Sequence, residues 1–282
     1  MNWEKEVLFG FRYQLILIFK PSAYGLIFSE TGRIQIYIWA YLNPMTVQDL
    51  GACIFLLTGM VFSVVGGKLT FAGAVCGGIV GLLVYRGAGI TGIFMLAMFF
   101  LSGSSATAWQ LKKKQHLGLA EKEGGLRTAW QVIANGGPAA IFGALTWLLP
   151  AQTTLLQLIM AGSLASATAD TLSSELGSIY GSRFYDILSF KQADAGPNGV
   201  VSLEGTLIGV AGAAIIAFVY VTGFGFNVFA LLIVAAGAIG NLCDSLLGAT
   251  LERRNLMGNN AVNFTTNCAG AVSCLLLYFL VK

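Results

Sequence analysis

The chain has 282 residues, of which 56% are hydrophobic and only 10% are charged, and its mean hydropathy is +0.76. A soluble domain carries about 25% charged residues, and a disordered chain is poor in hydrophobic ones, so both classes are excluded. The net charge of +3 is too small for a nucleic-acid binder. One His and five cysteines without a CxxC pair argue against a zinc site or a disulfide framework. The composition is typical of a polytopic membrane protein.

The first 48 residues contain two short apolar stretches. The first runs from Val7 to Phe19 and is interrupted by Arg12, and the second runs from Ile34 to Leu42. Both are shorter than the roughly 20 residues that a membrane-spanning helix needs. Residues 1–48 therefore predict interfacial amphipathic helices or one additional span. They contain no signal-peptide cleavage pattern, so we expect this segment to stay attached.

Charge-free apolar stretches predict the spans of the second part of the chain, residues 49–282. In chain order these stretches are 50–67, 69–85, 87–111, 128–169, 205–243 and 255–281. The runs of 42 and 39 residues are each long enough for two spans, and each has turn residues near its middle, at Pro150–Thr154 and Thr222–Asn227. The sequence therefore predicts an all-α fold, a polytopic transmembrane bundle of about eight helices.

Basic residues in the connections predict the orientation. The connection from Lys112 to Arg127 holds five Lys and Arg residues, and the positive-inside rule places it in the cytoplasm. Alternation places three further connections on that side, those around Lys68, at 177–204 and around Arg253. The turns assigned to the other side at Pro150 and at 222–227 carry no charge. We therefore expect the polar chemistry at the cytoplasmic end of the bundle.

Three acidic residues, Asp170, Glu175 and Asp244, lie at the cytoplasmic ends of apolar helices. A carboxylate at membrane depth is costly unless it is paired, hydrated or bound to a cation. Oxygen-bearing neighbours favour Mg²⁺ over a transition metal, and the alternative is that these are solvated residues at helix ends. Asp170 and Glu175 are about 140° apart on an ideal helix. These two carboxylates can bind one ion together only if the helix unwinds near Ser173. The alternative is that Glu175 binds a second ion.

A short pattern occurs twice in the C-terminal half. Asp170-Thr171-Leu172 precedes the Asn198–Ser202 segment, and Asp244-Ser245-Leu246 precedes the Asn259–Asn263 segment. Each copy is a helix that reaches the cytoplasm with an Asp, followed by a polar connection and an Asn-containing start of the returning helix. Two copies in one orientation predict a parallel internal repeat with the site between them.

The segment from Lys191 to Ser202 contains glycines, starts with a basic residue and directly precedes a helix. Helix N-terminal amides favour anions. Together with Arg253 and Arg254 on the neighbouring connection, this segment predicts a phosphate-binding site. A plain polar linker is the alternative.

Four sequence blocks resemble the signature blocks of an integral membrane family that includes the plant phytyl-phosphate kinase and has cyanobacterial, other bacterial and archaeal members. They are Ser166–Gly177, Asn198–Thr206, Asp244–Thr250 and Asn260–Phe264, with a further block at Glu123–Gly136. The resemblance covers roughly residues 50–282. One departure is the loop Gly196-Pro197-Asn198-Gly199-Val200-Val201-Ser202, where the family usually has Gly-Thr-Asn-Gly-Gly-Val-Ser.

The resemblance implies a membrane kinase that transfers a phosphoryl group from a nucleoside triphosphate to an isoprenyl monophosphate such as phytyl or geranylgeranyl phosphate, forming the diphosphate. CTP is the implied donor and Mg²⁺ the implied cofactor. Residues 49–282 are then the catalytic domain of a multi-pass protein of a prokaryotic cell membrane or a plastid-type membrane. The bilayer, the lipid and the nucleotide are its expected partners, no nucleic acid is expected, and its oligomeric state is left open.

The expected site residues fall into two groups. Those with catalytic roles are Asp170, Glu175, Asp244, Lys191, Arg253 and Arg254, of which Asp170, Glu175 and Asp244 are the expected metal ligands. Those that contact substrate are Asn135, Ser174, Asn198, Gly199, Ser202, Ser245, Asn260 and Asn263.

Three other classes of membrane protein are alternatives to the kinase. A CDP-lipid-type cytidylyltransferase would use similar carboxylates and Mg²⁺ but release pyrophosphate. A membrane transporter would place its carboxylates near the bilayer midplane, between inverted repeats. An intramembrane aspartyl protease would have a Gly-x-Gly-Asp context, where this chain has Asn241-Leu242-Cys243-Asp244. Carboxylates at one membrane face and a parallel repeat favour the kinase.

Overall fold

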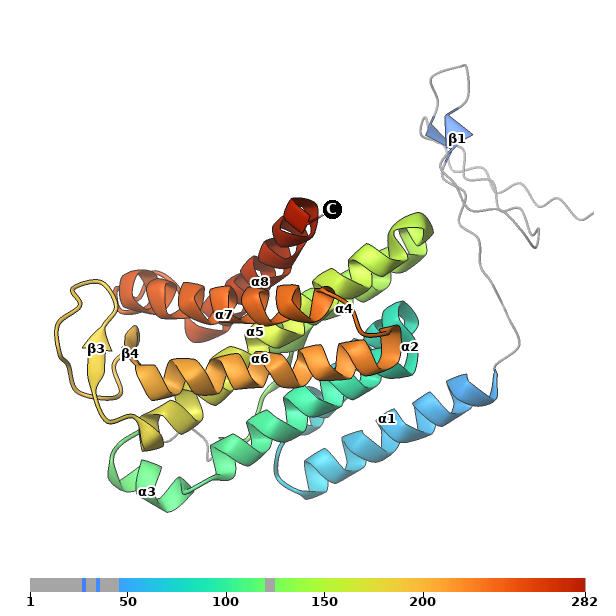
Figure 1. Ribbon diagram of the computed structural model, residues 1–282. Coiled ribbons are helices and arrows are strands. Elements are labelled where there is room, and N and C mark those ends of the chain that lie inside the picture. The colour runs from blue at the N-terminus through green and yellow to red at the C-terminus, as the bar shows by residue number, and fades with distance from the viewer. Residues whose placement is uncertain (1–26, 29–33, 36–45, 120–124, 282) are drawn as a thin grey trace, which may run out of the picture. The chain divides into compact units, whose positions relative to one another are not determined.

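A computed structural model of the chain describes residues 27–28, 34–35, 46–119 and 125–281 (Figure 1). The chain divides into two units, residues 1–50 and 51–282. In the first unit, β1 (Ile27–Phe28) pairs with β2 (Ile34–Gln35) in antiparallel fashion. The interfacial helices or additional span predicted for residues 1–48 otherwise fall outside the described residues.

The second unit is a helical bundle, as the sequence predicts. Its helices, the first of which begins at the end of the first unit, are α1 (Val47–Val65), α2 (Phe71–Ala108), α3 (Leu111–His116), α4 (Ala129–Leu148), α5 (Thr153–Tyr180), α6 (Leu203–Phe224), α7 (Phe229–Leu247) and α8 (Asn259–Val281). A 3₁₀ turn, η2 (Pro150–Gln152), precedes α5, and a π-helical turn, η3 (Gly248–Glu252), extends α7. Between α5 and α6, β3 (Phe184–Asp186) pairs with β4 (Val200–Ser202).

Six helices in the described part of the chain are long and apolar enough to cross a membrane: α1, α2, α5, α6, α7 and α8. The chain is therefore an all-α polytopic membrane protein. Helix α4 matches the predicted helix at 128–149 but is not among the six. It carries Gln131, Asn135 and Pro138 among its apolar residues, which lower its hydropathy.

Helix α2 covers two of the predicted spans, because the chain reverses within it. Gly89 has φ 60° and ψ −149°, a conformation open to glycine because it has no Cβ. In a straight helix, Gly73 and Gly103 would be about 45 Å apart. Yet a Cβ on Gly73 would lie 2.8 Å from the Arg127 carbonyl oxygen, and one on Gly103 would lie 2.8 Å from Arg127 Nη2. The two halves of α2 therefore run antiparallel, as the predicted spans 69–85 and 87–111 require.

Helix α5 lies at the centre of the bundle and contacts α2, α4, α6, α7 and α8 (Figure 1). It is buried without interruption from Leu158 to Ala169. Small residues allow this close packing: a Cβ on Gly237 of α7 would lie 3.1 Å from Ala165 Cβ. Asp170 directly follows this buried stretch, so the core of the bundle fixes its position.

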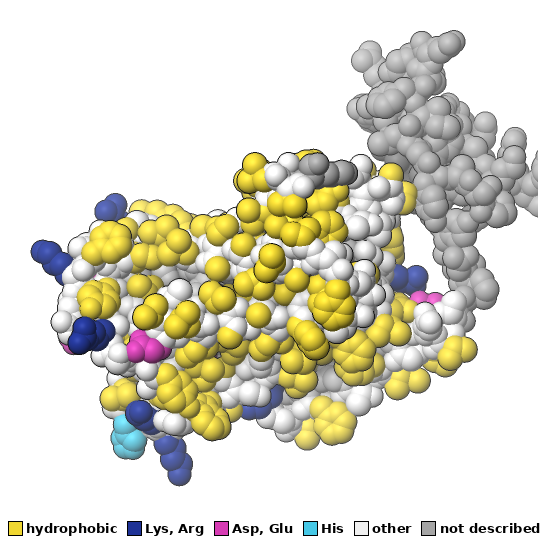
Figure 2. Space-filling view, viewed as in Figure 1, with side chains coloured by type: hydrophobic (Ala, Val, Ile, Leu, Met, Phe, Trp, Pro, Cys, Tyr) yellow, Lys and Arg dark blue, Asp and Glu magenta, His cyan; other side chains and the backbone are white. Residues whose placement is uncertain are grey.

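The polar connections meet at one end of the bundle. Arg127 N–H donates to the Lys68 carbonyl at 3.0 Å, Lys114 pairs with Glu175, and Arg253 pairs with Asp186. Figure 2 shows most of the charged side chains on this view gathered at that end, where Figure 1 has β3, β4 and α3, and hydrophobic side chains over the helices. The connections predicted to share a side therefore do share an end, which we call the polar end.

Helix α1 packs loosely. Of its residues, only Ala52 and Ser63 are buried. Its contacts with α2 are made by long side chains: a Cβ on Gly78 would lie 2.6 Å from Met60 Sδ, and one on Gly81 would lie 2.5 Å from Leu56 Cδ2. This arrangement leaves space between α1 and the rest of the bundle.

Candidate functional site

Asp170 of α5 and Asp244 of α7 meet at the polar end of the bundle. Their carboxyl groups are in hydrogen-bonding contact, and Thr266 Oγ1 of α8 donates to Asp244 Oδ1 at 3.4 Å. Both aspartates are half-buried. Two ionised carboxylates in contact repel each other, so this pair requires a shared proton or a bound cation. Three helices therefore build a small site of oxygen atoms.

The π-helical turn η3 continues α7 beyond Asp244. Single π-helical turns are frequent at functional sites. At its end, Glu252 is in hydrogen-bonding contact with Asn198 and lies within electrostatic reach of Asp244. The sequence analysis omitted Glu252 from the site, because next to Arg253 and Arg254 it reads as part of a solvated charged connection.

The loop before α6 rests on η3. Val200 N–H donates to the Pro197 carbonyl at 3.1 Å and closes a turn in which Gly199 has φ +76°. A Cβ on Gly199 would lie 2.3 Å from Ala249 Cβ and 2.7 Å from its Cα. Both the left-handed backbone and the close approach require glycine. The structure thus brings Asn198 and Gly199 to the end of α7.

Of the three predicted basic residues, Arg253 is engaged in a protein contact. Its Nη1 donates to Asp186 Oδ2. This contact and the Ser189 N–H lower the pKa of the Asp186 carboxyl to about 2. Arg253 therefore ties η3 to the β3–β4 loop, and its role at phosphate stays a prediction. The side chains of Lys191 and Arg254 are exposed at the same end.

Glu175 pairs with residues other than the aspartates, and its role as a metal ligand stays a prediction. Its Oε2 pairs with Lys114 Nζ, and its Oε1 accepts a hydrogen bond from Thr107 Oγ1 at 2.8 Å. Helix α5 continues without unwinding to Tyr180, so Glu175 faces a different direction from Asp170. The described residues contain no group of three or more His, Cys, Asp and Glu side chains placed to hold a metal ion.

Three predicted substrate-binding serines have hydrogen bonds within local structure. The hydroxyls of Ser174 and Ser245 donate to the main-chain carbonyl four residues earlier, at 3.0 and 3.2 Å. The buried Ser202 hydroxyl accepts from Gly205 N–H at 3.0 Å and caps α6. Ser202 is therefore a helix cap, and its predicted contact with substrate remains untested.

Three of the four predicted asparagines lie on helices α4 and α8, whereas Asn198 lies in the loop before α6. Asn260 is exposed in the first turn of α8, and Asn263 is half-buried one turn later. Asn135 lies on α4, where its Nδ2 donates to the Gln131 carbonyl at 3.0 Å. Its Oδ1 is buried and has no hydrogen-bond partner within the described part of the chain. Asn135 lines a cavity.

The cavity has a volume of about 580 Å³ and lies between α1, the two halves of α2, and α4. Its lining is largely apolar and includes Phe55, Met60 and Phe99. Two basic residues, Lys68 and Arg127, also line it at the polar end. The sequence does not predict this cavity, because apolar runs do not show which helices pack loosely.

Arg127 lies both in the cavity wall and beside the helix that carries Asp170. It is 9% exposed, and its guanidinium carbon lies 5.7 Å from the centre of the Phe99 ring, in the cavity wall. A Cβ on Gly103 would lie 2.8 Å from Arg127 Nη2 and 3.2 Å from Thr171 Cγ2. Thr171 follows Asp170 in sequence, so the guanidinium lies beside the helix that carries this aspartate.

The fold and the site define a multi-pass integral membrane protein with a pair of contacting carboxyl groups at one end of its helical bundle. The chain matches the family described as integral membrane protein DUF92 over residues 54–271 and belongs to that family. This confirms the family to which the signature blocks pointed.

Several relatives cover most of the chain. An uncharacterized membrane protein of Methanocaldococcus jannaschii is 32% identical over 73% of this chain and 84% of its own length. Protein VTE6, chloroplastic, of Arabidopsis thaliana is 29% identical over 77% of this chain and 69% of its own length. An uncharacterized membrane protein of Synechocystis sp. is 31% identical over 68% of this chain and 76% of its own length. No solved structure matches the chain.

Proposed function

We propose that this protein is a membrane kinase that transfers a phosphoryl group from a nucleoside triphosphate, CTP in the first instance, to an isoprenyl monophosphate such as phytyl or geranylgeranyl phosphate. The observation that carries the proposal is the contact between the Asp170 and Asp244 carboxyl groups where the polar connections meet. The resemblance to the family of the plant phytyl-phosphate kinase supports the choice of reaction.

The residues at this point fit Mg²⁺. Asp170 and Asp244 supply two carboxylates and Thr266 supplies a hydroxyl oxygen, which are the kinds of ligand that hard cations prefer, and Glu252 lies within electrostatic reach. The contacting carboxylates gain most from a cation, because it removes their mutual repulsion. Mg²⁺ held here by Asp170 and Asp244 would neutralise phosphate charge and orient the transferring group.

The reaction requires little covalent chemistry from the protein. An oxygen of the acceptor phosphate forms a bond to the γ-phosphorus of the donor, the bond from that phosphorus to the β–γ bridging oxygen breaks, and the nucleoside diphosphate leaves. A phosphate monoester has its second pKa near 6 and is therefore ionised at neutral pH, so no strong general base is needed. Catalysis of this kind depends on positioning and on electrostatic stabilisation.

The side chains at the polar end are suited to these tasks. Lys191 and Arg254 are exposed cations that can bind nucleotide phosphates, and the Asn198–Gly199 turn is held against η3. We place this end in the cytoplasm, because nucleoside triphosphates are there and because the Lys112–Arg127 connection is basic.

Product analysis tests the proposal. Purified protein in detergent or vesicles is incubated with Mg²⁺, each of the four nucleoside triphosphates, and isoprenyl monophosphates of several chain lengths. Isoprenyl diphosphate and nucleoside diphosphate in equal amounts are the expected products, with Asp170→Asn as the inactive control. Pyrophosphate with a nucleotide-linked lipid would identify a cytidylyltransferase instead. Absence of any product with all donors would overturn the kinase assignment.

A further inference from the structure

The cavity between α1, α2 and α4 has one apolar part and one charged end. Phe55, Leu56 and Met60 of α1 face it from one side, and Phe99 of α2 and Val132 of α4 from the other. At the polar end of the bundle, Lys68 and Arg127 line the same cavity. Their backbones are joined, since Arg127 N–H donates to the Lys68 carbonyl at 3.0 Å. Two basic residues therefore lie at one end of an apolar space.

This distribution of charge selects the chemistry of an occupant. A hydrocarbon chain gains free energy by leaving water for the apolar part. An anionic group attached to one end of that chain would reach Lys68 and Arg127. A volume of about 580 Å³ lies within the range of about 300–1,000 Å³ that is typical of sites for one small ligand. It suits one hydrocarbon chain better than the two chains of a bilayer phospholipid.

The charged end of the cavity also lies close to α5, the helix that carries Asp170. Arg127 belongs to the cavity wall, and its Nη2 lies beside Gly103 close to Thr171, the residue that follows Asp170. A phosphate group bound to this guanidinium would therefore lie on the side of the cavity that faces the carboxyl groups. Guanidinium groups bind phosphate in a bidentate manner, which fixes its orientation.

We infer that this cavity is the binding site of the acceptor lipid: it holds the single hydrocarbon chain of a lipid monophosphate, and Lys68 and Arg127 bind the phosphate group. The inference rests on the proposed function for the identity of the reaction, and it adds where the acceptor lies and which residues hold it. The loose packing of α1, which buries only Ala52 and Ser63 of its residues, gives the chain access from the bilayer.

Binding is measured without nucleotide, so that it does not depend on kinase activity. The probe is a C20 alkyl monophosphate that carries a diazirine near the far end of its chain, and labelled peptides are identified after illumination in vesicles. We expect label on the cavity-facing parts of α1, α2 and α4. Excess unlabelled C20 monophosphate should remove it, whereas the C20 alcohol and a diacyl phosphatidate should compete at least about tenfold less well.

One variant fills the cavity and another serves as its matched control. Gly77 lines the cavity, and a Cβ there would lie 3.9 Å from Leu69 Cδ1, an ordinary contact. Gly77→Leu should therefore fold and reduce labelling at least about tenfold. Gly51 of α1 has nothing within 4 Å of a Cβ and does not line the cavity, so Gly51→Leu should label normally. Lys68→Gln should weaken binding of the monophosphate about tenfold and leave binding of the alcohol unchanged.

The outcomes separate this inference from the proposed function. Cavity labelling that depends on the phosphate, without isoprenyl diphosphate formation, supports the binding site and removes the kinase. Normal phosphorylation of a C20 monophosphate by folded Gly77→Leu would overturn the cavity as the acceptor site and leave the kinase standing. Label confined to the outer surface of the bundle, or equal competition by the alcohol and phosphatidate, would also overturn the inference.

Discussion

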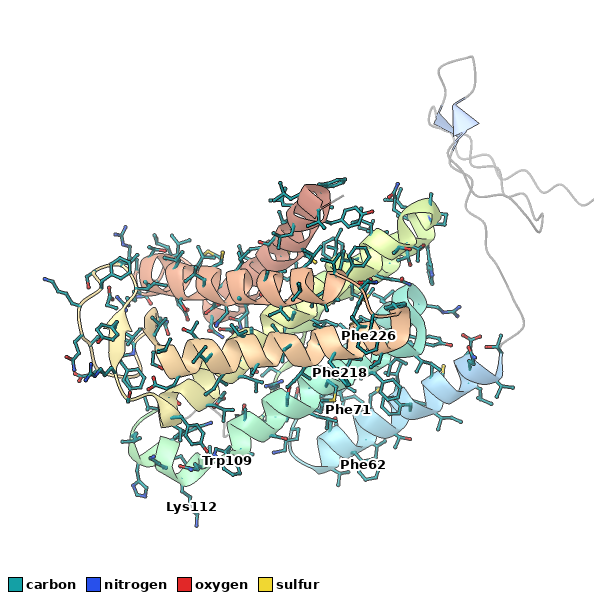
Figure 3. All side chains as sticks on the ribbon, viewed as in Figure 1. Phe62, Phe71, Trp109, Lys112, Phe218 and Phe226 are labelled. Atoms are coloured by element: carbon teal, nitrogen blue, oxygen red, sulfur yellow. The ribbon has the colours of Figure 1, made fainter. Side chains whose placement is uncertain are left out.

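Lys114 and Glu175 form an ion pair in the interior of the protein, with side-chain exposures of 1% and 8%. Lys114 Nζ also donates to the Ala106 carbonyl at 2.7 Å, and Glu175 accepts from Thr107 Oγ1 at 2.8 Å. The pair fastens α3 and the end of α2 to α5. Lys112, two residues before Lys114, is exposed and extends from α3 near Trp109 (Figure 3), so lysines of one short run differ in their surroundings.

Glu175→Gln should destabilise the protein. The substitution leaves the Lys114 ammonium buried without its counter-charge, a change that typically costs about 3–5 kcal/mol. We expect a lower Tm in detergent, and we expect Lys114→Met combined with Glu175→Leu to recover much of the loss. If Glu175→Gln instead keeps its Tm but loses Mg²⁺-dependent turnover, Glu175 is a catalytic residue, as the sequence analysis predicted.

Asp170→Asn and Asp244→Asn should each lower turnover by about 100-fold or more, a typical loss when a preorganised electrostatic contact is removed. Each variant retains the size of the side chain and removes one charge of the contacting pair, so the fold should persist. Initial rates over a range of Mg²⁺ concentrations, with Tm as the control for folding, test this. A variant with a normal rate at saturating Mg²⁺ would show that its aspartate is no ligand.

Arg253 and Arg254 should respond differently to replacement by Ala. Arg253 is paired with Asp186, so Arg253→Ala and Asp186→Asn should both release the β3–β4 loop and speed its cleavage by protease. Arg254→Ala and Lys191→Ala should leave proteolysis unchanged and lower kcat more than they raise KM, since contacts that strengthen in the transition state act on the chemical step. Normal kinetics for both exposed residues would place the nucleotide site elsewhere.

The Arg253–Asp186 link should persist in moderate acid. Its contacts lower the pKa of Asp186 from 3.8 to about 2. A lowered pKa in the folded state stabilises the protein above the unfolded value, and this contribution is lost as the pH falls through the folded value. The resistance of the 187–199 loop to pepsin should therefore hold near pH 4 and fall toward pH 2. Asp186→Asn should abolish this pH dependence.

Cysteine labelling tests which face carries the site. Gln115, Gln152 and Gln192 are exposed positions for single cysteines in a background where the five native cysteines are replaced. Labels at 115 and 192 should be accessible from the cytoplasm and a label at 152 from the other side. Accessibility of 115 and 192 from opposite faces would contradict the shared polar end.

The sequence predicted the helices well, because apolar runs and turn residues determine where a helix can cross a bilayer. The sequence also indicated Asp170 and Asp244, because their apolar neighbours show that these carboxylates lie at membrane depth, where an unpaired charge is energetically costly. The pairing of Glu175 with Lys114 was not predictable, since it depends on Lys114 being turned inward by the short helix α3. Arg127 was predicted only as part of the basic connection and not as a site residue for the same reason: its burial against Phe99 arises from tertiary packing.

Because the chain reverses at Gly89, α2 crosses the membrane twice and not once. If α2 were one uninterrupted crossing, Lys68 and Lys112 would emerge in different compartments, and every later connection would be assigned to the wrong one. Because a single glycine turns the chain back within one continuous apolar helix, a count of long helices takes α2 as one crossing, whereas Arg86 divides the sequence there into the two spans that were predicted. Reporter fusions placed on either side of α2 should accordingly give the same compartment.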